Sequence, residues 1–253
     1  MFRKLSKWLN PSIDLKVYRL RIKKKRKLPE DILSPEEVLR LLECADSLRY
    51  RAIISTIYES GCRVGELLGI RVKDLFFDDY GAVIMVDGKT GMRRIRLVSS
   101  VPLLAQYLQD HRFRDDSLAP LFYRIDKRCK TVLSETAVNK MLKDTALRAG
   151  IKKRVYPHLF RHSRATHLAK YLTEQELKVF FGWAGDSKMA CVYVHLSGRD
   201  IEAKILEING LRSREQPTES LFRPKECPRC RQTNSPEAKY CNQCGATLGT
   251  LLV

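Results

Sequence analysis

The stretch from Pro157 to Leu168 reads PHLFRHSRATHL and places three histidines and two arginines within twelve residues of helical character. Pro157 favours a helix start, so His158 should lie in the first turn, where free N–H groups and the helix dipole favour an anion. His158 and Arg161 are three residues apart and therefore share a face, which predicts a phosphate-binding pocket. The other basic residues should point elsewhere, in structural or phosphate-facing roles: His162, Arg164 and His167.

The composition favours a polyanionic partner. The 253 residues include 47 Lys and Arg against 29 Asp and Glu, a formal net charge of +18. Such a surplus attracts nucleic acid, although a merely soluble basic protein is the alternative. We find no apolar run of the roughly 18 residues that a membrane span needs, and no signal peptide. We therefore expect no membrane partner and a cytoplasmic, nucleoid-associated location.

Residues 16–28, KVYRLRIKKKRKL, contain eight Lys or Arg and no acidic residue. Runs of this kind are usually solvated arms. Contacts from such an arm to DNA would be made mainly to phosphates. The candidate DNA-binding residues are Lys23, Lys24, Lys25, Arg26 and Lys27.

The hydrophobic pattern predicts a mostly helical α+β chain with one small antiparallel sheet. Ser34, Ser134 and Thr173 are expected to cap helices, and Gly61 and Gly150 to end two of them. The expected helices cover residues 34–45, 50–60, 101–108, 135–149, 174–181, 186–193 and 199–210, and the expected strands cover 82–86 and 93–98. A polar stretch, RSREQPTES, indicates a linker over residues 213–223.

The C-terminal cysteines are spaced for a metal. CPRC, ten intervening residues and CNQCG supply two thiolate pairs, each suited to adjacent corners of a zinc tetrahedron. A dithiol redox pair is the alternative, but two pairs in a tail of about 30 residues without its own core favour a structural zinc ribbon over residues 224–253. The predicted ligands are Cys227, Cys230, Cys241 and Cys244.

The stretch DGKTG is similar to half of a phosphate-binding P-loop. That motif requires a glycine five positions before Gly88, where this chain has Val83, and it requires a helix where RRIRLV predicts a strand. We therefore exclude a nucleoside-triphosphate site. Lys89 is expected at the tip of a hairpin, where it either reaches into a neighbouring cleft or is an ordinary exposed turn lysine.

HLFRHSRATHL resembles the H-x-x-R-H box of the tyrosine recombinases, the phage-integrase-like DNA strand-exchange enzymes. Three further stretches resemble other boxes of that family, in the family's order: ESGCRVGELLGIRVKDL, GKTGMRRIRL and FGWAGDSKMACVYVHLSG. The resemblance covers about residues 30–210 and implies a tyrosine-recombinase catalytic domain over residues 30–212. With its zinc ribbon, the chain looks like some archaeal members.

The resemblance also implies the site residues. Tyr193 would be the nucleophile, and Trp183 stands where many members have histidine. Glu66 and His162 would support the site. The full implied catalytic set is Arg63, Lys89, His158, Arg161, Trp183 and Tyr193. Tyr156 and Tyr171 are rival nucleophiles, but Tyr156 abuts a proline and Tyr171 is expected in the middle of the preceding helix.

These residue types permit strand cleavage. Arg63 and Arg161 can each fork two N–H donors onto phosphate oxygens and stabilise the transition state. His158 can move a proton, Lys89 can protonate the departing 5′-oxygen, and the indole N–H of Trp183 can donate to phosphate. The product would join Tyr193 to a DNA 3′-phosphate. Because the bond energy is retained, neither ATP nor a catalytic metal is implied.

The expected function is therefore a site-specific DNA recombinase or integrase acting on double-stranded DNA as a homo-oligomer. A type IB topoisomerase-like enzyme, or a non-catalytic DNA-binding regulator derived from a recombinase, is the alternative. Most members of the family carry an N-terminal helical domain of about a hundred residues. Here residues 1–29 would be a basic arm that keeps only the end of such a domain.

Overall fold

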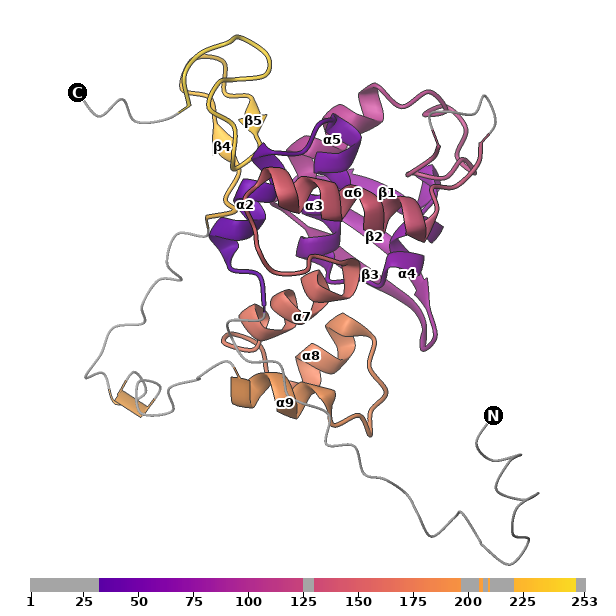
Figure 1. The fold of residues 1–253 in the computed structure, drawn as a ribbon, viewed down its shortest axis with the longest axis vertical. Helices are drawn as coiled ribbons and strands as arrows, with labels where there is room; N and C mark the ends of the chain where they lie inside the picture. The colour runs from indigo at the N-terminus through magenta and orange to yellow at the C-terminus, as the bar shows by residue number, and fades with distance from the viewer. Residues whose placement is uncertain (1–31, 125–129, 197–204, 207–208, 210–220, 249–253) are drawn as a thin grey trace, which may run out of the picture.

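The computed structural model describes residues 32–124, 130–196, 205–206, 209 and 221–248. Over these residues the chain is mostly helical, with a small antiparallel sheet on one side (Figure 1). The elements are α2 (Pro35–Glu43), α3 (Leu48–Ser60), α4 (Val64–Gly69), the 3-10 turn η2 (Val72–Asp74), β1 (Leu75–Asp78), β2 (Gly81–Gly88), β3 (Gly91–Leu97), α5 (Val101–Gln109), α6 (Glu135–Arg148), α7 (Pro157–Leu168), α8 (Glu174–Phe181), α9 (Met189–Leu196), β4 (Lys225–Glu226) and β5 (Thr233–Asn234). The arm at 1–29, the 213–220 part of the expected linker and most of the helix expected at 199–210 lie outside the described residues.

Local capping chemistry determines several helix starts. Ser34 and Thr173 each form a capping box with the glutamate three residues on, and the Ser134 side chain accepts a hydrogen bond from the N–H of Ala137. Each cap satisfies N–H groups that have no partner within the helix. These starts agree with the sequence expectations, as does the left-handed Gly61 at the end of α3.

Other boundaries differ from the expectations. α3 starts two residues early because the Ser47 side chain accepts from the N–H of Tyr50. α9 begins at Met189 and not at Asp186, because a turn from Ala184 to Ser187 precedes it. The short helix α4 and the strand β1 were not expected.

The sheet has the order β1–β2–β3 with antiparallel pairing throughout. Leu75, Ile84 and Ile95 face one another across the three strands and are buried. Gly88 pairs with Gly91, so Lys89 and Thr90 form the tip of the β2–β3 hairpin. The two expected strands are confirmed, and Lys89 lies at a hairpin tip as the sequence predicts.

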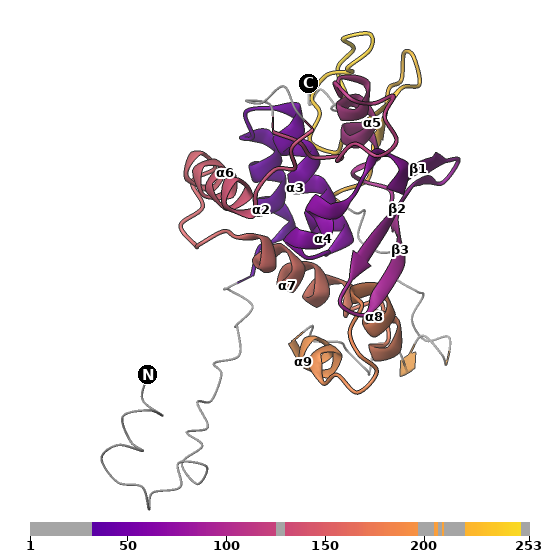
Figure 2. The ribbon, with the colours of Figure 1, turned by 90° about the vertical axis from the view of Figure 1, so that its right-hand side faces the viewer.

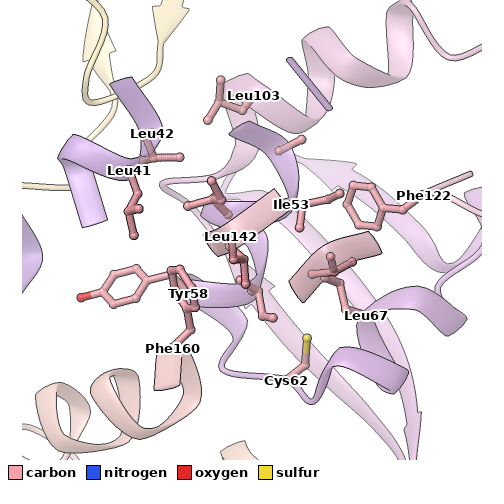
Figure 3. Close-up of a cluster of buried hydrophobic side chains, with 14 of the residues drawn as sticks. Leu41, Leu42, Ile53, Tyr58, Cys62, Leu67, Leu103, Phe122, Leu142 and Phe160 are labelled. Carbon is pink, nitrogen blue, oxygen red and sulfur yellow. The ribbon is translucent and has the colours of Figure 1, made fainter. Parts of the chain in front are cut away.

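Helix α3 lies at the centre of the main core, with Ala52 to Ser60 buried throughout. It packs against α2, α5 and α7 and against strand β3. Figure 3 shows side chains from these elements meeting at α3, including Leu41 from α2, Leu103 from α5 and Phe160 from α7. This packing fixes the end of α3, from which the chain turns through Gly61 into α4.

A second, smaller apolar cluster joins α7, α8 and α9 below the main core (Figure 1). Its buried members are Ala165, Ala169, Leu177, Phe181, Ala190 and Tyr193. The position of α9 therefore depends on a few small side chains and two aromatic rings.

Residues 221–248, called here the cysteine-rich segment, pack on the end of the main domain that lies opposite α8 and α9 (Figure 1). The Phe222 ring lies 4.8 Å from the Tyr58 ring, centroid to centroid. Glu237 forms an ion pair with Arg51 of α3. None of the described helices combines the length and apolar character that crossing a membrane requires.

Candidate active site

A cleft of about 550 Å³ lies between α4, the tip of the β2–β3 hairpin and the N-terminal ends of α6 and α7. Three of the expected catalytic side chains, Arg63, Lys89 and His158, line it. The other lining residues are Val64, Gly65, Glu66, Asp87, Gly88, Glu135 and Pro157. Lys89 and His158 are exposed, and the Arg63 side chain is 40% exposed. Two cationic side chains and one imidazole, from distant parts of the sequence, thus face one cleft.

Glu66 fixes Arg63 at the edge of this cleft. Its carboxylate accepts hydrogen bonds from the backbone N–H of Arg63 (2.8 Å) and from the Arg63 guanidinium (2.7 Å). Burial alone would raise the pKa of Glu66, but the hydrogen bonds from Arg93 and Arg63 lower it to about 2. The carboxylate is therefore charged at neutral pH and can orient Arg63.

Arg93 is a site residue that the sequence analysis missed. Its Nη1 and Nη2 atoms donate to the two oxygens of Glu66 at 3.1 and 2.6 Å, and its Nε atom donates to the carbonyl of Phe180 at 3.2 Å. A signal was present, because alternation along β3 places Arg93 on the same face as Ile95 and Leu97. An arginine on the inward face of a strand requires an acidic partner.

Arg161 is only 2% exposed and is absent from the residues that line the cleft, so it does not form an open pocket with His158. It donates to the carbonyls of Gly61 (2.8 Å) and Phe181 (2.5 Å), and its guanidinium stacks near the rings of Phe181 and Trp183. Burial, assisted by the charge of Arg63, lowers its pKa to about 10, so it stays charged at neutral pH. These bonds use two of its five N–H donors.

Tyr193 is 4% exposed and is absent from the residues that line the cleft. Its hydroxyl hydrogen-bonds to Nδ1 of His162, and its ring stacks on Trp183 with centroids 5.4 Å apart and planes 7° apart. Burial raises the pKa of the phenol to about 12, and the charge of Arg161 opposes this only in part. In this arrangement the hydroxyl is neither exposed nor activated.

The expectation that His162 points away from His158 is wrong. The two rings are in contact with centroids 4.5 Å apart, because residues four apart also share a helix face. His162 thus connects His158 at the cleft to Tyr193.

The two remaining basic residues of α7 have structural roles. Arg164 donates to the carbonyl of Glu59 at 3.1 Å, and His167 shares a 2.8 Å hydrogen bond with the Tyr58 hydroxyl. Tyr171 does not lie within a helix as expected: α7 ends at Leu168, and Tyr171 is 62% exposed in the turn that follows.

Comparison with known proteins assigns the chain to a family. Residues 31–199 match the model of the phage integrase family, which is more than half of the chain. The chain belongs to the phage integrase family. All the residues of the cleft, together with Arg161, Trp183 and Tyr193, fall within the matched range.

Named members of the phage integrase family are similar over much of the chain. The tyrosine recombinase XerC of Xanthomonas axonopodis pv. citri is 32% identical over 197 residues, covering 76% of this chain and 62% of the relative. The tyrosine recombinase XerA of Pyrococcus furiosus is 36% identical over 152 residues, covering 59% of this chain and 52% of the relative. The chain spans less than two thirds of the length of these relatives.

Solved structures share the fold. A crystal structure of XerA recombinase aligns with a TM-score of 0.57 and 25% identity, covering 74% of this chain and 67% of that one. A structure of XerH site-specific recombinase bound to palindromic difH substrate, in a post-cleavage complex, aligns with a TM-score of 0.59 and 23% identity, over 75% of this chain and 56% of that one. The mostly helical catalytic-domain fold with a small antiparallel sheet is therefore confirmed.

The four predicted metal ligands lie beyond the range that matches the family. Their Sγ atoms are all within 4.8 Å of one another, and zinc–sulfur bonds of about 2.3 Å place tetrahedral ligands about 3.8 Å apart. The Cys241 sulfur also accepts from the N–H of Gln243 at 3.4 Å and from the Asn234 amide at 3.7 Å. The cluster fits a four-coordinate metal ion without a free position for a substrate. This donor set is compatible with a zinc ribbon.

Proposed function

We propose that the chain performs site-specific recombination of double-stranded DNA, cleaving and rejoining strands through a covalent bond between Tyr193 and a DNA 3′-phosphate. The observation that carries this proposal is the position of Arg161. It donates to the carbonyl of Gly61, two residues before Arg63, and its guanidinium lies over the ring of Trp183, which stacks on Tyr193. Arg161 therefore links the cationic cleft to the buried phenol. The relatives named tyrosine recombinases support the same activity.

Each residue is assigned one role. Arg63, held by Glu66, and Arg161 bind the non-bridging phosphate oxygens and stabilise the charge of the transition state. His158 accepts the proton that leaves the phenol of Tyr193 and later returns it. Lys89 protonates the 5′-oxygen as it departs. Trp183 offers its indole N–H to the phosphate and stacks on Tyr193.

Cleavage requires Tyr193 to leave its present position. Because Tyr193 as a residue is only 4% exposed, its hydroxyl cannot reach a phosphodiester of a duplex without a shift of α9. The shift would break the hydrogen bond to His162 and the stacking on Trp183. It would also return the phenol to a charged, solvated environment where its pKa falls. We assign this movement to the step that follows DNA binding.

A basic groove beside the cleft supports DNA as the substrate. The groove, of about 690 Å³, runs between α6 and the segment that leads to Tyr156, two residues before His158 in the cleft. Its exposed cations are Lys140, Lys143, Lys152 and Arg154. DNA phosphates that follow this groove would arrive at the cleft. The lysines and the arginine of residues 23–27 are proposed to add phosphate contacts.

The cysteine-rich segment is proposed to bind one structural zinc ion. A segment with so small a core gains its folding free energy from the metal. Cys227, Cys230, Cys241 and Cys244 would hold the ion. The domains are accordingly proposed as a basic arm at 1–29, a catalytic domain at 30–212, a linker at 213–223 and a zinc ribbon at 224–253.

Exchange of strands between two duplexes requires more than one active site, so we propose a homo-oligomer on DNA. We also propose that the chain works in the cytoplasm, at the nucleoid. A type IB topoisomerase-like enzyme would relax supercoils without exchanging strands between duplexes. A non-catalytic regulator would bind DNA without covalent capture.

The proposal is tested with a nicked DNA substrate that traps the covalent intermediate. The unmodified protein should form an adduct that resists denaturation, and Tyr193→Phe should form none. The Tyr171→Phe variant is the matched control, because Tyr171 is 62% exposed, whereas Tyr193 is buried and hydrogen-bonded to His162. An adduct that persists in Tyr193→Phe would assign the nucleophile elsewhere. No adduct with the unmodified protein would favour the regulator, and relaxation without exchange would favour the topoisomerase.

A further inference from the structure

We propose that Arg93 is the positioning residue for Lys89. By holding Glu66 and the C-terminal end of α8 together, Arg93 fixes the tip of the β2–β3 hairpin so that Lys89 faces Arg63 and His158 across the cleft. This inference rests on the proposed function, in which Lys89 protonates the departing 5′-oxygen.

The first observation is the geometry of the Arg93 guanidinium. Two parallel N–H bonds join it to both oxygens of Glu66, and its third donating atom, Nε, binds the carbonyl of Phe180. The Arg93 and Glu66 side chains are 10% and 4% exposed. Bidentate, buried pairs of this kind restrict orientation more than single charge contacts do. Arg93 therefore ties the hairpin to α4 and to α8 at once.

The second observation concerns the residues on either side of Lys89. A Cβ atom on Gly88 would lie 2.5 Å from Oε1 of Glu66 and 3.0 Å from Nη1 of Arg93. On the other side, the hydroxyl of Thr90 donates to the carbonyl of Gly182 at 3.1 Å. The backbone of Lys89 is thus held on both sides while its side chain stays exposed in the cleft.

The third observation is the fit of α8 against this hairpin (Figure 2). Gly182 ends α8 with a φ of +57°, which glycine adopts without strain. A Cβ atom there would lie 3.0 Å from Nη1 of Arg93 and 3.1 Å from the Thr90 hydroxyl. Because Gly88 and Gly182 have no Cβ atom, there is room beside both of them for the Arg93 side chain. Gly182 is followed directly by Trp183, whose ring stacks on Tyr193. The contact between α8 and the hairpin is therefore adjacent in sequence to a residue that packs on Tyr193.

Cleavage moves two protons, and only one of them concerns Lys89. The bond from the Tyr193 oxygen to phosphorus forms, the phenol proton passes to His158, and the bond from phosphorus to the 5′-oxygen breaks as that oxygen takes a proton from Lys89. If the 5′-oxygen is replaced by sulfur, the leaving group departs as a thiolate, because thiols have pKa values of about 8.5. A sulfur substrate therefore does not need the proton donor.

The experiment compares single-turnover cleavage of nicked substrates that carry oxygen or sulfur at the scissile 5′ position. A misplacement of about 1 Å costs up to about 10²-fold in rate. We expect Arg93→Met to cleave the oxygen substrate about 10²-fold more slowly than the unmodified protein does. We expect it to cleave the sulfur substrate within a few-fold of the unmodified protein. Lys89→Ala should show the same pattern and serves as the reference for loss of the donor.

The controls separate positioning from folding. Arg96→Met makes the same substitution three residues along β3, where the side chain pairs with Asp78 at the surface, and it should leave both rates unchanged. Thr90→Val removes the hydrogen bond to Gly182 while keeping Arg93. It should slow cleavage of the oxygen substrate less than Arg93→Met does, and it should cleave the sulfur substrate at close to the normal rate. Thermal unfolding of every variant shows whether it folds; if Arg93→Met does not, Arg93→Lys and Thr90→Val provide the comparison.

The outcomes have different meanings. Equal losses on both substrates in the Arg93 variants would overturn the positioning inference and leave the proposed function intact, since Arg93 would then act through Arg63 or the fold. Normal cleavage of the oxygen substrate by Arg93→Met would also overturn it. No adduct with the unmodified protein on either substrate would reject the proposed function itself, and the inference with it.

Discussion

Glu237 of the cysteine-rich segment forms an ion pair with Arg51 of α3, with Oε1 and Nη2 2.6 Å apart. The two residues are separated by 186 positions in the sequence. Arg51 lies in the helix whose end leads through Gly61 to Arg63. The cysteine-rich segment therefore contacts the helix whose end leads to the cleft, although it lies at the other end of the domain.

Breaking this ion pair should destabilise the whole chain. The Glu237 side chain is 2% exposed and that of Arg51 is 32% exposed, so solvent screens part of the interaction. We expect Glu237→Gln to lower the free energy of unfolding by about 1 kcal/mol. Urea unfolding followed by helical circular dichroism measures this. Glu226→Gln, an exposed acid in the same segment, should have no such effect, and equal stability of the two variants would contradict the prediction.

Metal removal should also reduce stability beyond the cysteine-rich segment. When the segment unfolds, Phe222 no longer packs on Tyr58 and the ion pair of Glu237 is lost, a change of about 2 kcal/mol. Each kcal/mol shifts Tm by about 2–4 °C in a chain of this size. We expect one zinc per chain by elemental analysis, and a Tm about 4–8 °C lower after chelation. Added zinc should restore the Tm and magnesium should not, whereas an unchanged helical Tm after chelation would show that the segment folds independently.

Stability should fall in acid because of His167. Burial and the charge of Arg164 lower its pKa to about 4, whereas the unfolded chain has a pKa of about 6.5. The unfolded state binds the proton more readily, so stability is full above pH 6.5 and is lost as the pH falls towards 4. The loss is at most about 3 kcal/mol.

Chemical unfolding at a series of pH values, compared with His167→Gln, measures this contribution. The variant should keep only the smaller pH dependence of His111, whose pKa burial also lowers. An equally steep pH dependence in the variant would mean that His167 does not titrate as expected.

The basic groove should contribute affinity but not chemistry. We expect Lys143→Gln combined with Arg154→Gln to weaken DNA binding and to reduce the slope of log K against log salt by about 2. Cleavage at saturating DNA should keep its rate. Fluorescence anisotropy at several salt concentrations gives the slope. Lys239→Gln combined with Arg229→Gln removes the same charge from the cysteine-rich segment and should leave the slope nearly unchanged. Equal effects of the two pairs of substitutions would show that DNA does not follow the groove.

The sequence predicts most of the elements because their signals are local. Ser34, Ser134 and Thr173 mark helix starts through side-chain hydrogen bonds within three residues, and such bonds do not depend on the rest of the fold. α4 lacks this signal: its N-cap is Arg63, held by Glu66 and not by a hydroxyl. β1 is short and has a single buried residue, so it has no alternating pattern to detect.

The site was predicted in part. The cleft gathers Arg63, Lys89 and His158 as the family boxes imply, but the bond between Glu66 and Arg93 joins residues 27 positions apart and depends on how the hairpin packs. The burial of Tyr193 is likewise a property of α7, α8 and α9 packing together. No sequence pattern within α9 indicates whether the Tyr193 hydroxyl is buried or exposed.

Under the proposed function, the buried Tyr193 hydroxyl would allow the chain to bind DNA without cleaving it. A chain with a formal net charge of +18 would bind duplexes non-specifically, at many unrelated sequences. Under the proposed function, with Tyr193 enclosed between His162 and Trp183, those contacts would break no strand, and cleavage would require an assembly in which α9 has moved. On that proposal, the frequency of α9 release, and not the affinity for DNA, would set the rate of cleavage.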